Sequence, residues 1–127
     1  MADVFISYSR KDSEFVRRLH DALLTENKET WVDWEGIPPV AEWFREIRSA
    51  IEGADTFIFV LSPDSVASDI RRKEIDHAEK HNKRLIPVVC REVNSGDVSE
   101  ALAKLNWIFF SGSDPFDSSF RTLMEAL

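Results

Sequence analysis

One glutamate, Glu74, stands where a packed helix would place an aliphatic side chain. The polar residues at 62–65 are expected to cap a helix that runs to about His81. With about 100° per residue and Val66 as zero, Glu74 falls at roughly 80°, in the middle of the apolar arc of this helix. The arc is formed by Val66, Ala67, Ile70, Ile75 and Ala78. Because burial of an unpaired carboxylate is costly, Glu74 must meet a charged partner, a cleft or a ligand.

Arg71 lies on the same arc, at roughly 140°. It precedes Glu74 by three residues, a spacing at which two side chains on a helix meet. In one interpretation the two residues form a structural ion pair, which can also place charges on an apolar face. In the other, the carboxylate faces a cleft, where it can bind sugar hydroxyls or stabilise a developing positive charge. The helical wheel does not distinguish these alternatives.

The elements that must position Glu74 alternate between strand and helix. Short apolar runs predict five strands, at 4–8, 30–32, 56–61, 85–90 and 107–110. Helical spacing predicts helices after Asp12, at 41–51, from 62 to about 81, at 98–105 and at 118–127. This order predicts an α/β fold, a flavodoxin-like three-layer sandwich with a five-stranded parallel sheet. Ligands bind beyond the carboxyl ends of such strands, which here are followed by residues 7–10, 33–43 and 62–74.

Composition limits the kinds of partner and the cellular compartment that we expect for this chain. The 16 Lys and Arg against 23 Asp and Glu give a net charge of −7, so we expect no nucleic-acid partner. Cys90 is the only cysteine, which excludes an internal disulfide and fits a reducing compartment. No apolar run approaches the roughly 18 residues of a membrane span, so we expect a cytoplasmic protein with no membrane partner. The length predicts one domain over residues 1–127, a size that also occurs as one part of a longer protein.

Four segments resemble the TIR (Toll/interleukin-1 receptor) domain family. Residues 5–9, FISYS, resemble the first box of the family, and residues 31–39, WVDWEGIPP, resemble its second strand and BB loop in the bacterial form. Residues 59–63, FVLSP, with Ser65, Ser68 and Glu74, resemble the central strand and the helix that bears the catalytic glutamate. Residues 84–88, RLIPV, resemble the fourth strand. The four segments occur in the order and spacing of the family, and the match covers essentially the whole chain. The chain resembles the NAD-cleaving members of the family.

The resemblance implies an enzyme, an NAD+ glycohydrolase or cyclase. Such an NAD+ nucleosidase cleaves the nicotinamide–ribose bond and gives nicotinamide and linear or cyclic ADP-ribose, in immune, antiphage defence or cell-death signalling. Glu74 takes the place of the catalytic glutamate, which would hold the ribose and stabilise an oxocarbenium-like state. Trp43 takes the place of an aromatic that stacks on a ring of the nucleotide. The other substrate-binding positions implied are Ser9, Arg10, Asp33 and Arg71. NAD+ is the substrate, so no further cofactor is expected.

The same resemblance implies an alternative function, a non-catalytic module for TIR–TIR interaction. In that case the BB loop docks another TIR domain and propagates a homotypic signalling assembly. The BB loop consists of Trp34, Glu35, Gly36, Ile37, Pro38, Pro39 and Val40. Its apolar members on an exposed loop would suit an interface. The two functions are compatible, because related enzymes often need assembly to complete the site.

Other motifs favour simpler interpretations. His77 and His81 share one helix face at i, i+4, but the sequence places no third ligand near them, so no metal site is expected. The tryptophans as a group are expected in the core or at interfaces, with Trp43 as the exception. The ends of the first and third strands lack the aspartates of a phosphate-accepting receiver domain, which has the same layered fold. The loop at 9–12 lacks the Gly- and Thr-rich cradle of a flavin site.

Overall fold

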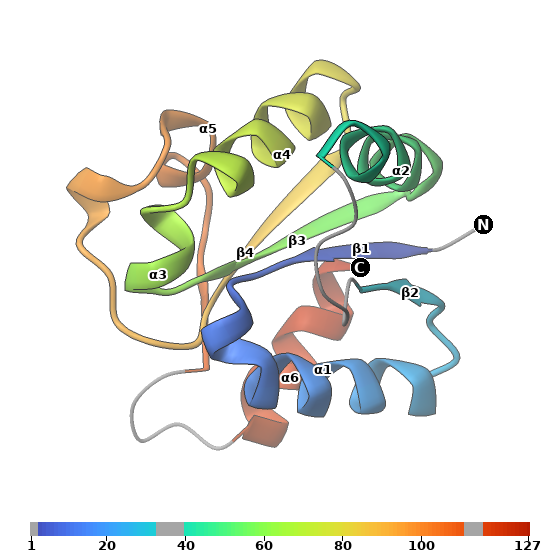
Figure 1. The fold of residues 1–127 in the computed structure, drawn as a ribbon. Coiled ribbons are helices and arrows are strands. Elements are labelled where there is room, and N and C mark those ends of the chain that lie inside the picture. Colours follow the sequence, from blue (N-terminus) through green and yellow to red (C-terminus); the bar gives the residue numbers. More distant parts are fainter. Residues whose placement is uncertain (1–2, 33–39, 111–115) are drawn as a thin grey trace.

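A five-stranded parallel sheet forms the centre of the structure (Figure 1). The computed structural model describes residues 3–32, 40–110 and 116–127. The strands are β1 (Val4–Ser7), β2 (Thr30–Trp31), β3 (Thr56–Leu61), β4 (Arg84–Val89) and β5 (Ile108–Phe109). Their order in the sheet is β2-β1-β3-β4-β5, and neighbouring strands are parallel. The predicted five-stranded parallel sheet is therefore confirmed.

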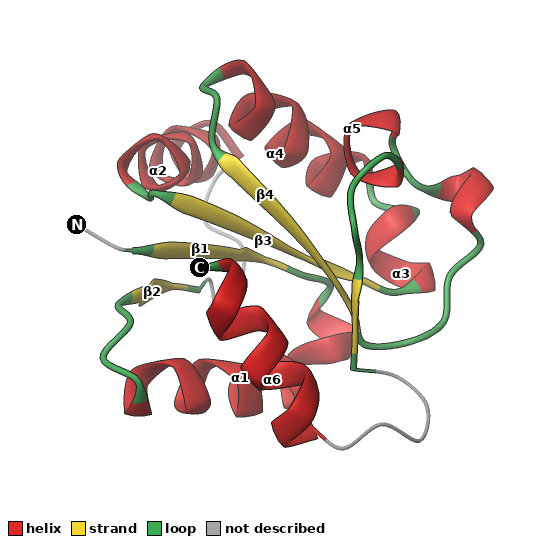
Figure 2. Ribbon diagram, turned by 180° about the vertical axis from the view of Figure 1, so that it is seen from behind, coloured by secondary structure: helices red, strands yellow, loops and turns green. Residues whose placement is uncertain are grey.

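Helices cover both faces of the sheet, as Figures 1 and 2 show from opposite sides. The longer helices are α1 (Ser13–Thr25), α2 (Val40–Gly53), α4 (Asp69–Lys80) and α6 (Phe116–Ala126). The short ones are η1 (Arg10–Asp12), α3 (Pro63–Val66), η2 (Ser95–Asp97) and α5 (Glu100–Ala103). Helices α1 and α6 pack on one face, and α2, α4 and α5 pack on the other, which gives the predicted three layers. Within the described residues, no helix is both long enough and apolar enough to cross a membrane.

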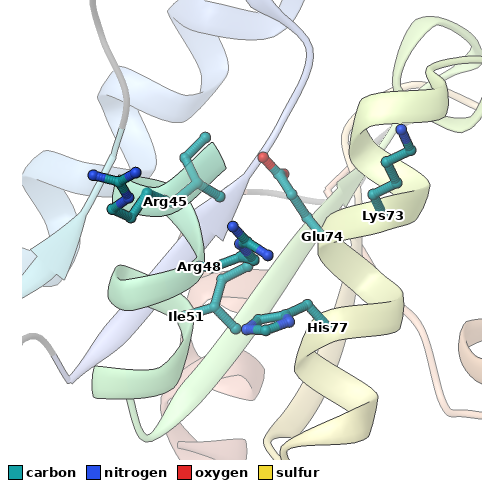
Figure 3. A pocket seen from close by; sticks show the side chains of 7 residues that line it. Arg45, Arg48, Ile51, Lys73, Glu74 and His77 are labelled. Carbon is teal, nitrogen blue, oxygen red and sulfur yellow. The ribbon is translucent and has the colours of Figure 1, made fainter. Parts of the chain in front are cut away.

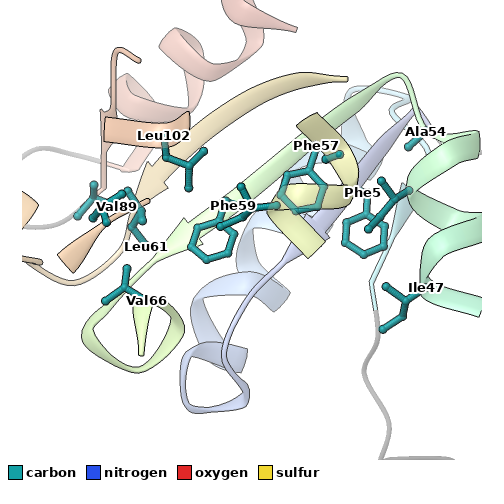
Figure 4. Packing of buried hydrophobic residues seen from close by; sticks show 13 residues of the cluster. Phe5, Ile47, Ala54, Phe57, Phe59, Leu61, Val66, Val89 and Leu102 are labelled. Atoms are coloured by element: carbon teal, nitrogen blue, oxygen red, sulfur yellow. The ribbon is translucent and has the colours of Figure 1, made fainter. Parts of the chain in front are cut away.

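Strand β3 runs through the middle of the core, and its residues are all buried. Successive side chains point to opposite faces, so Phe57 packs in the cluster under α2 and α4, and Ile58 packs in the cluster under α1. The rings of Phe5, Phe57 and Phe59 lie among aliphatic side chains in the first of these clusters (Figure 4). Phe5 stacks between Trp31 and Phe57, with ring centroids 4.9 Å and 5.3 Å away. Trp31 thus packs against the core, as predicted.

The segment predicted as one helix from 62 to about 81 consists of two helices, α3 and α4. Ser62 caps α3, and its hydroxyl accepts the backbone N–H of Ser65 at 3.2 Å. Ser68 has extended backbone angles and caps α4, where its hydroxyl accepts the backbone N–H of Arg71 at 3.4 Å. Serine side chains that bond to backbone groups compete with helix continuation. The chain therefore leaves the helix after α3 and starts a new one.

This break corrects part of the predicted apolar arc. Ile70 is 38% exposed and Ala67 is exposed, although both were predicted to be buried. They lie at the junction of the two helices, where the apolar face of a continuous helix does not extend. Glu74, Ile75 and Ala78 lie within the uninterrupted part of α4 and are buried as predicted.

The strand order reverses beside β1, which lies between β2 and β3. The chain moves to one side of β1 and later to the other, so the loops after β1 and β3 diverge at the carboxyl edge of the sheet. Ligands of open parallel sheets bind at such a point. Ser7 ends β1, and α4 begins a few residues beyond β3 and brings Glu74 within hydrogen-bond distance of Ser7.

Candidate functional site

The Glu74 carboxylate is buried, with 3% of the residue exposed. Ser7 Oγ donates a hydrogen bond to Glu74 Oε1 at 2.6 Å. Arg71 Nη1 donates to both carboxylate oxygens, at 3.1 Å to Oε1 and 2.9 Å to Oε2. The contact that the i to i+3 spacing predicts is therefore present as an ion pair. Charge-assisted hydrogen bonds of this kind fix the orientation of the carboxylate.

Arg71 is itself confined between α4 and the end of β1. Its guanidinium carbon lies 6.0 Å from the ring centroid of Tyr8, at the outer limit of a cation–π contact. Tyr8 is buried, and the Arg71 side chain is only 12% exposed. The carboxylate is thus positioned partly by a neighbour on its own helix and partly by Ser7, which is 67 residues away in the sequence.

Glu74 also lines an open pocket of about 520 Å³ between α2 and α4 (Figure 3). The residues described as lining it are Arg45, Ile47, Arg48, Ile51, Lys73, Glu74 and His77. In Figure 3, Glu74 and His77 reach in from α4, and Arg45, Arg48 and Ile51 come from α2. The volume is in the usual range for small-molecule sites. Three cations beside one carboxylate suit a ligand that carries both phosphate groups and sugar hydroxyls.

Two of the predicted substrate-binding residues follow β1 directly. Ser9 caps η1, and its hydroxyl accepts the backbone N–H of Lys11 at 3.3 Å. Arg10 lies in η1 and is exposed. Neither belongs to the described lining of the pocket that contains Glu74. Their role in substrate binding stays a prediction.

The remaining predicted positions fall largely outside the described residues. Asp33 and the loop at 34–39 lie outside them, so the predictions of a substrate contact and of a docking loop rest on the sequence. Val40 begins α2, and Trp43 lies in the first turns of that helix, but their side chains lie outside the described part of the chain. Trp43 precedes the pocket residue Arg45 by two positions.

Several residues of the pocket were not found from the sequence. Arg45 and Arg48 are spaced i, i+3 beside the apolar Ile47 and Ile51, so the helical wheel of α2 carries a usable signal for them. Lys73 falls at roughly 340° on the helical wheel that starts at Val66, outside the apolar arc, so the wheel gives no signal for it. From the sequence, Ser7 could be placed only near the end of the first strand, because its contact with Glu74 depends on how α4 packs on the sheet.

The expectation that His77 and His81 have no third ligand is wrong. Glu52, at the end of α2, places its Oε2 2.7 Å from His77 Nε2 and 3.9 Å from His81 Nε2. The hydrogen bond from His77 lowers the pKa of the Glu52 carboxyl. This arrangement could not be predicted from the sequence, because Glu52 is 25 residues before His77 and approaches it only through the packing of α2 on α4.

A second group of polar residues lies at the same edge of the sheet, and two of its members, Asp12 and Ser62, are buried. This Asp12 cluster consists of Asp12, Ser62, Asp64 and Arg91. Asp12 is 5% exposed and accepts hydrogen bonds from the Ser62 hydroxyl and from Arg91 Nε, the latter at 2.7 Å. Arg91 also pairs with Asp64 and holds the pKa of that carboxyl below its usual value. The cluster joins the segments that follow β1, β3 and β4.

Cys90 directly follows β4, beside the Asp12 cluster, and is half-buried. Burial raises the pKa of its thiol to about 12, and the negative charge of Asp12 acts in the same direction. A thiol that stays protonated is a poor nucleophile and a poor metal ligand. Cys90 also packs against the core cluster under α1 and α6, so we infer that it is a packing residue.

Comparison with known proteins identifies the family. Residues 4–124 match the sequence model of the TIR domain. The chain belongs to the TIR domain family. Among curated proteins, none matches this chain.

Solved structures share the fold of this TIR domain. The TIR domain of the Toll-related receptor TRR-2 from Hydra magnipapillata matches 99% of this chain and 98% of its own, with a TM-score of 0.81 and 25% identity. The TIR domains of the activated Roq1 resistosome, which recognises the pathogen effector XopQ, match 99% of both chains with a TM-score of 0.76 and 16% identity. A metazoan TIR-STING receptor from C. gigas, in complex with 2',3'-cGAMP, matches 86% of this chain and 35% of its own, with a TM-score of 0.70 and 23% identity. The last two likenesses show the fold alone.

Proposed function

We propose that this TIR domain is an NAD+ nucleosidase. It cleaves the nicotinamide–ribose bond and releases nicotinamide with linear or cyclic ADP-ribose. The observation that carries the proposal is the position of Glu74, a buried carboxylate that lines a pocket otherwise rich in cations. The TIR family includes NAD-cleaving members as well as non-catalytic ones.

Glu74 acts on the charge that develops when the bond breaks. The electron pair of the bond leaves with the nicotinamide nitrogen, so the cationic ring departs as a neutral molecule and positive charge appears on the ribose. A carboxylate near the ribose lowers the energy of that oxocarbenium-like state. Ser7 and Arg71 orient the carboxylate in advance, so little reorganisation is needed as the charge forms. Water then adds to the ribose carbon and loses a proton, or a nucleophile of the same molecule closes the ring.

The cations of the pocket bind the pyrophosphate of NAD+ in this proposal. Arg45 and Arg48 come from α2 and Lys73 from α4, so they flank the pocket from two sides. Guanidinium groups suit phosphate oxygens because they present several donors in one plane. Trp43 stacks on a ring of the nucleotide, and Ser9, Arg10 and Asp33 complete the site as the family resemblance implies.

The biological setting that we propose is immune or cell-death signalling through TIR–TIR assembly. The similar structures include the TIR domain of a Toll-related receptor, which supports a signalling setting. The BB loop is the proposed docking element. Homotypic assembly and NAD+ cleavage are compatible activities of one domain.

The ion pair between Arg71 and Glu74 favours a second candidate function, a non-catalytic interaction module. A buried carboxylate that is paired with an arginine and bonded to a hydroxyl also satisfies the requirements of a purely structural residue. In that case the task of the domain would be assembly alone, and Glu74 would only support the packing of α4 on β1.

The release of nicotinamide from NAD+ distinguishes the two functions. The assay uses the purified chain at high protein concentration, where assembly is favoured, and compares it with Glu74→Gln. We expect the Glu74→Gln variant to lose at least about 100-fold in rate, which is typical when an electrostatic contact to a transition state is removed. The matched control is Glu79→Gln, which changes an exposed glutamate of the same helix and should keep the activity.

The oligomeric state is measured on the same samples by size-exclusion chromatography with light scattering. Nicotinamide release that depends on Glu74 supports the enzyme. If the wild-type chain assembles but releases no more nicotinamide than Glu74→Gln, the enzyme proposal fails and the interaction module is supported. Thermal unfolding of both variants shows whether a loss of activity reflects a loss of folded protein.

A further inference from the structure

We propose that Glu52, His77 and His81 form a binding site for a divalent transition metal of the zinc class. The three side chains converge where the last turn of α2 meets the end of α4. Their ligand atoms lie within 4.8 Å of one another. Over the described residues, 3–32, 40–110 and 116–127, this is the group of His, Cys, Asp and Glu side chains that meets this condition. The inference does not depend on the NAD+ nucleosidase activity.

The two histidines share one face of a helix and address the same oxygen. His77 and His81 are one helical turn apart, with ring centroids 4.4 Å from each other. His77 Nε2 lies 2.7 Å and His81 Nε2 3.9 Å from Glu52 Oε2. Two histidines at i, i+4 on a helix recur as a zinc-binding pair because both imidazoles can reach one ion. Glu52 supplies the third ligand from a separate helix.

These distances suit a tetrahedral ion after small adjustments. With zinc–ligand bonds of about 2.0–2.1 Å, neighbouring ligand atoms of a tetrahedral site are about 3.3 Å apart. The two measured separations lie on either side of that value. The Glu52 and His81 side chains are 47% and 37% exposed, so both have room to change rotamer, whereas His77 is 17% exposed and more firmly placed. Two histidines and one carboxylate are also the ligand set of zinc sites that keep a fourth position for water or substrate.

The backbone around the site is held in place without the metal. Ile47 and Ile51 of α2 and Ile75 and Ala78 of α4 are buried in one core cluster, which fixes the separation of the two helices. Lys83 Nζ donates a hydrogen bond to the backbone carbonyl of Glu52 at 2.7 Å and ties the end of α2 to the turn after α4. A metal ion would therefore replace the proton shared by His77 and Glu52 without a rearrangement of the fold.

The site adjoins the pocket that contains Glu74, because His77 belongs to both. Figure 3 shows His77 on the same side of α4 as Glu74, facing α2. A bound ion would cross-link α2 to α4 at the edge of the pocket and stabilise the folded chain, since a ligand that binds the native state raises its stability.

The test is titration of the chelator-treated chain with zinc, in competition with a chromophoric chelator, and with cobalt, whose visible spectrum reports tetrahedral coordination. We expect one zinc ion per chain with a dissociation constant in the micromolar range or tighter, a tetrahedral cobalt spectrum and a higher unfolding temperature with zinc. His81→Ala and Glu52→Gln should each weaken binding by about 10-fold or more. The control is His20→Gln, which removes a histidine that contacts Thr30 and should leave zinc affinity unchanged.

His81 and Glu52 are exposed, so the His81→Ala and Glu52→Gln variants should still fold. Circular dichroism verifies that they do. Binding that is absent from the wild-type chain would overturn the proposal. So would equal zinc affinity in the wild-type chain, His81→Ala and Glu52→Gln, because the ion would then bind elsewhere.

Discussion

Two buried carboxylates, Glu74 and Asp12, have almost the same partners but lie in different surroundings. Each accepts a hydrogen bond from a serine hydroxyl and pairs with an arginine. Arg71 is three residues from Glu74 on the same helix, whereas Arg91 is 79 residues from Asp12. Glu74 also lines the pocket between α2 and α4, while Asp12 is enclosed by segments that follow three different strands.

This contrast shows that the chemistry of a buried pair does not by itself reveal its task. A long-range pair such as Asp12 with Arg91 holds together segments that are far apart in the unfolded chain. The pair of Arg71 with Glu74 forms within one helix and mainly sets the direction of the carboxylate. We therefore infer that the Asp12 cluster stabilises the carboxyl edge of the sheet, and that Glu74 is held in position for a ligand.

The largest expected effect concerns Cys90, which reports how closed the Asp12 cluster is. Its thiol pKa rises from 9.0 to about 12, so at pH 8 the folded chain contains less thiolate than an unfolded chain by a factor on the order of 1,000. Alkylation by iodoacetamide should be slower in the folded chain by a similar factor and should still increase between pH 9 and pH 11. Mass spectrometry measures the rates, with the chain in denaturant as the control. A rate that levels off near pH 9 would contradict the buried environment.

The second effect concerns the stability that Asp12 provides. Asp12→Asn removes the charge that Arg91 and Ser62 contact, and we expect a loss of about 1–3 kcal/mol in the free energy of unfolding. We do not expect a larger loss of stability, because the Arg91 side chain is 45% exposed and solvent screens its charge. Urea denaturation gives the measurement, and Asp21→Asn on the exposed side of α1 is the matched control. Equal midpoints for both variants would show that the Asp12 cluster adds no stability.

A third, smaller effect sharpens the role of the pocket around Glu74. Arg48→Ala should raise the KM for NAD+ by about 10-fold with little change in kcat, because a contact to the pyrophosphate is the same in the ground and transition states. The control is Arg17→Ala, which changes an exposed arginine of α1. Steady-state kinetics of nicotinamide release separate the two parameters. A lower kcat at constant KM would place Arg48 near the reacting bond instead.

The smallest effect is the pH dependence that Asp64 adds to the Asp12 cluster. Its pKa in the folded chain is lowered from 3.8 by the hydrogen bond from Arg91, so its contribution to stability is present above pH 3.8. The contribution is lost as the pH falls from 3.8 through the lower folded value. Asp64→Asn should therefore lose less stability than the wild-type chain over this range, as urea denaturation at several pH values would show. If the free energy of unfolding changes equally with pH in both chains, the contact between Arg91 and Asp64 does not contribute to stability.

Local patterns were sufficient to predict the fold and part of the site. The uninterrupted apolar run at 56–61 predicted a strand buried on both faces, and β3 has those bounds. The position of Glu74 among apolar residues predicted its burial, and the i to i+3 spacing predicted its contact with Arg71. Each of these features depends on a single helix or strand. The spacing of apolar residues along that element is therefore enough to predict it.

Contacts that depend on the packing of two elements could not be predicted from the sequence. Glu52 meets His77 because α2 packs on α4, and Ser7 meets Glu74 because α4 packs on the end of β1. Residues 62–81 divide into two helices because the Ser68 side chain accepts a hydrogen bond from the backbone of Arg71. The helical spacing of apolar residues continues across Ser68, so it predicted one helix. The predictions for Asp33 and the loop at 34–39 lie outside the described residues and stay predictions.

The most direct test measures nicotinamide release and thermal unfolding together for Glu74→Gln and Asp12→Asn. The comparison of the two carboxylates predicts opposite outcomes. Glu74→Gln should lose turnover by at least about 100-fold per folded molecule. Asp12→Asn should unfold at a lower temperature but keep its turnover per folded molecule. If both variants lose turnover only in proportion to their unfolded fraction, Glu74 is a structural residue and the proposed catalytic role is contradicted.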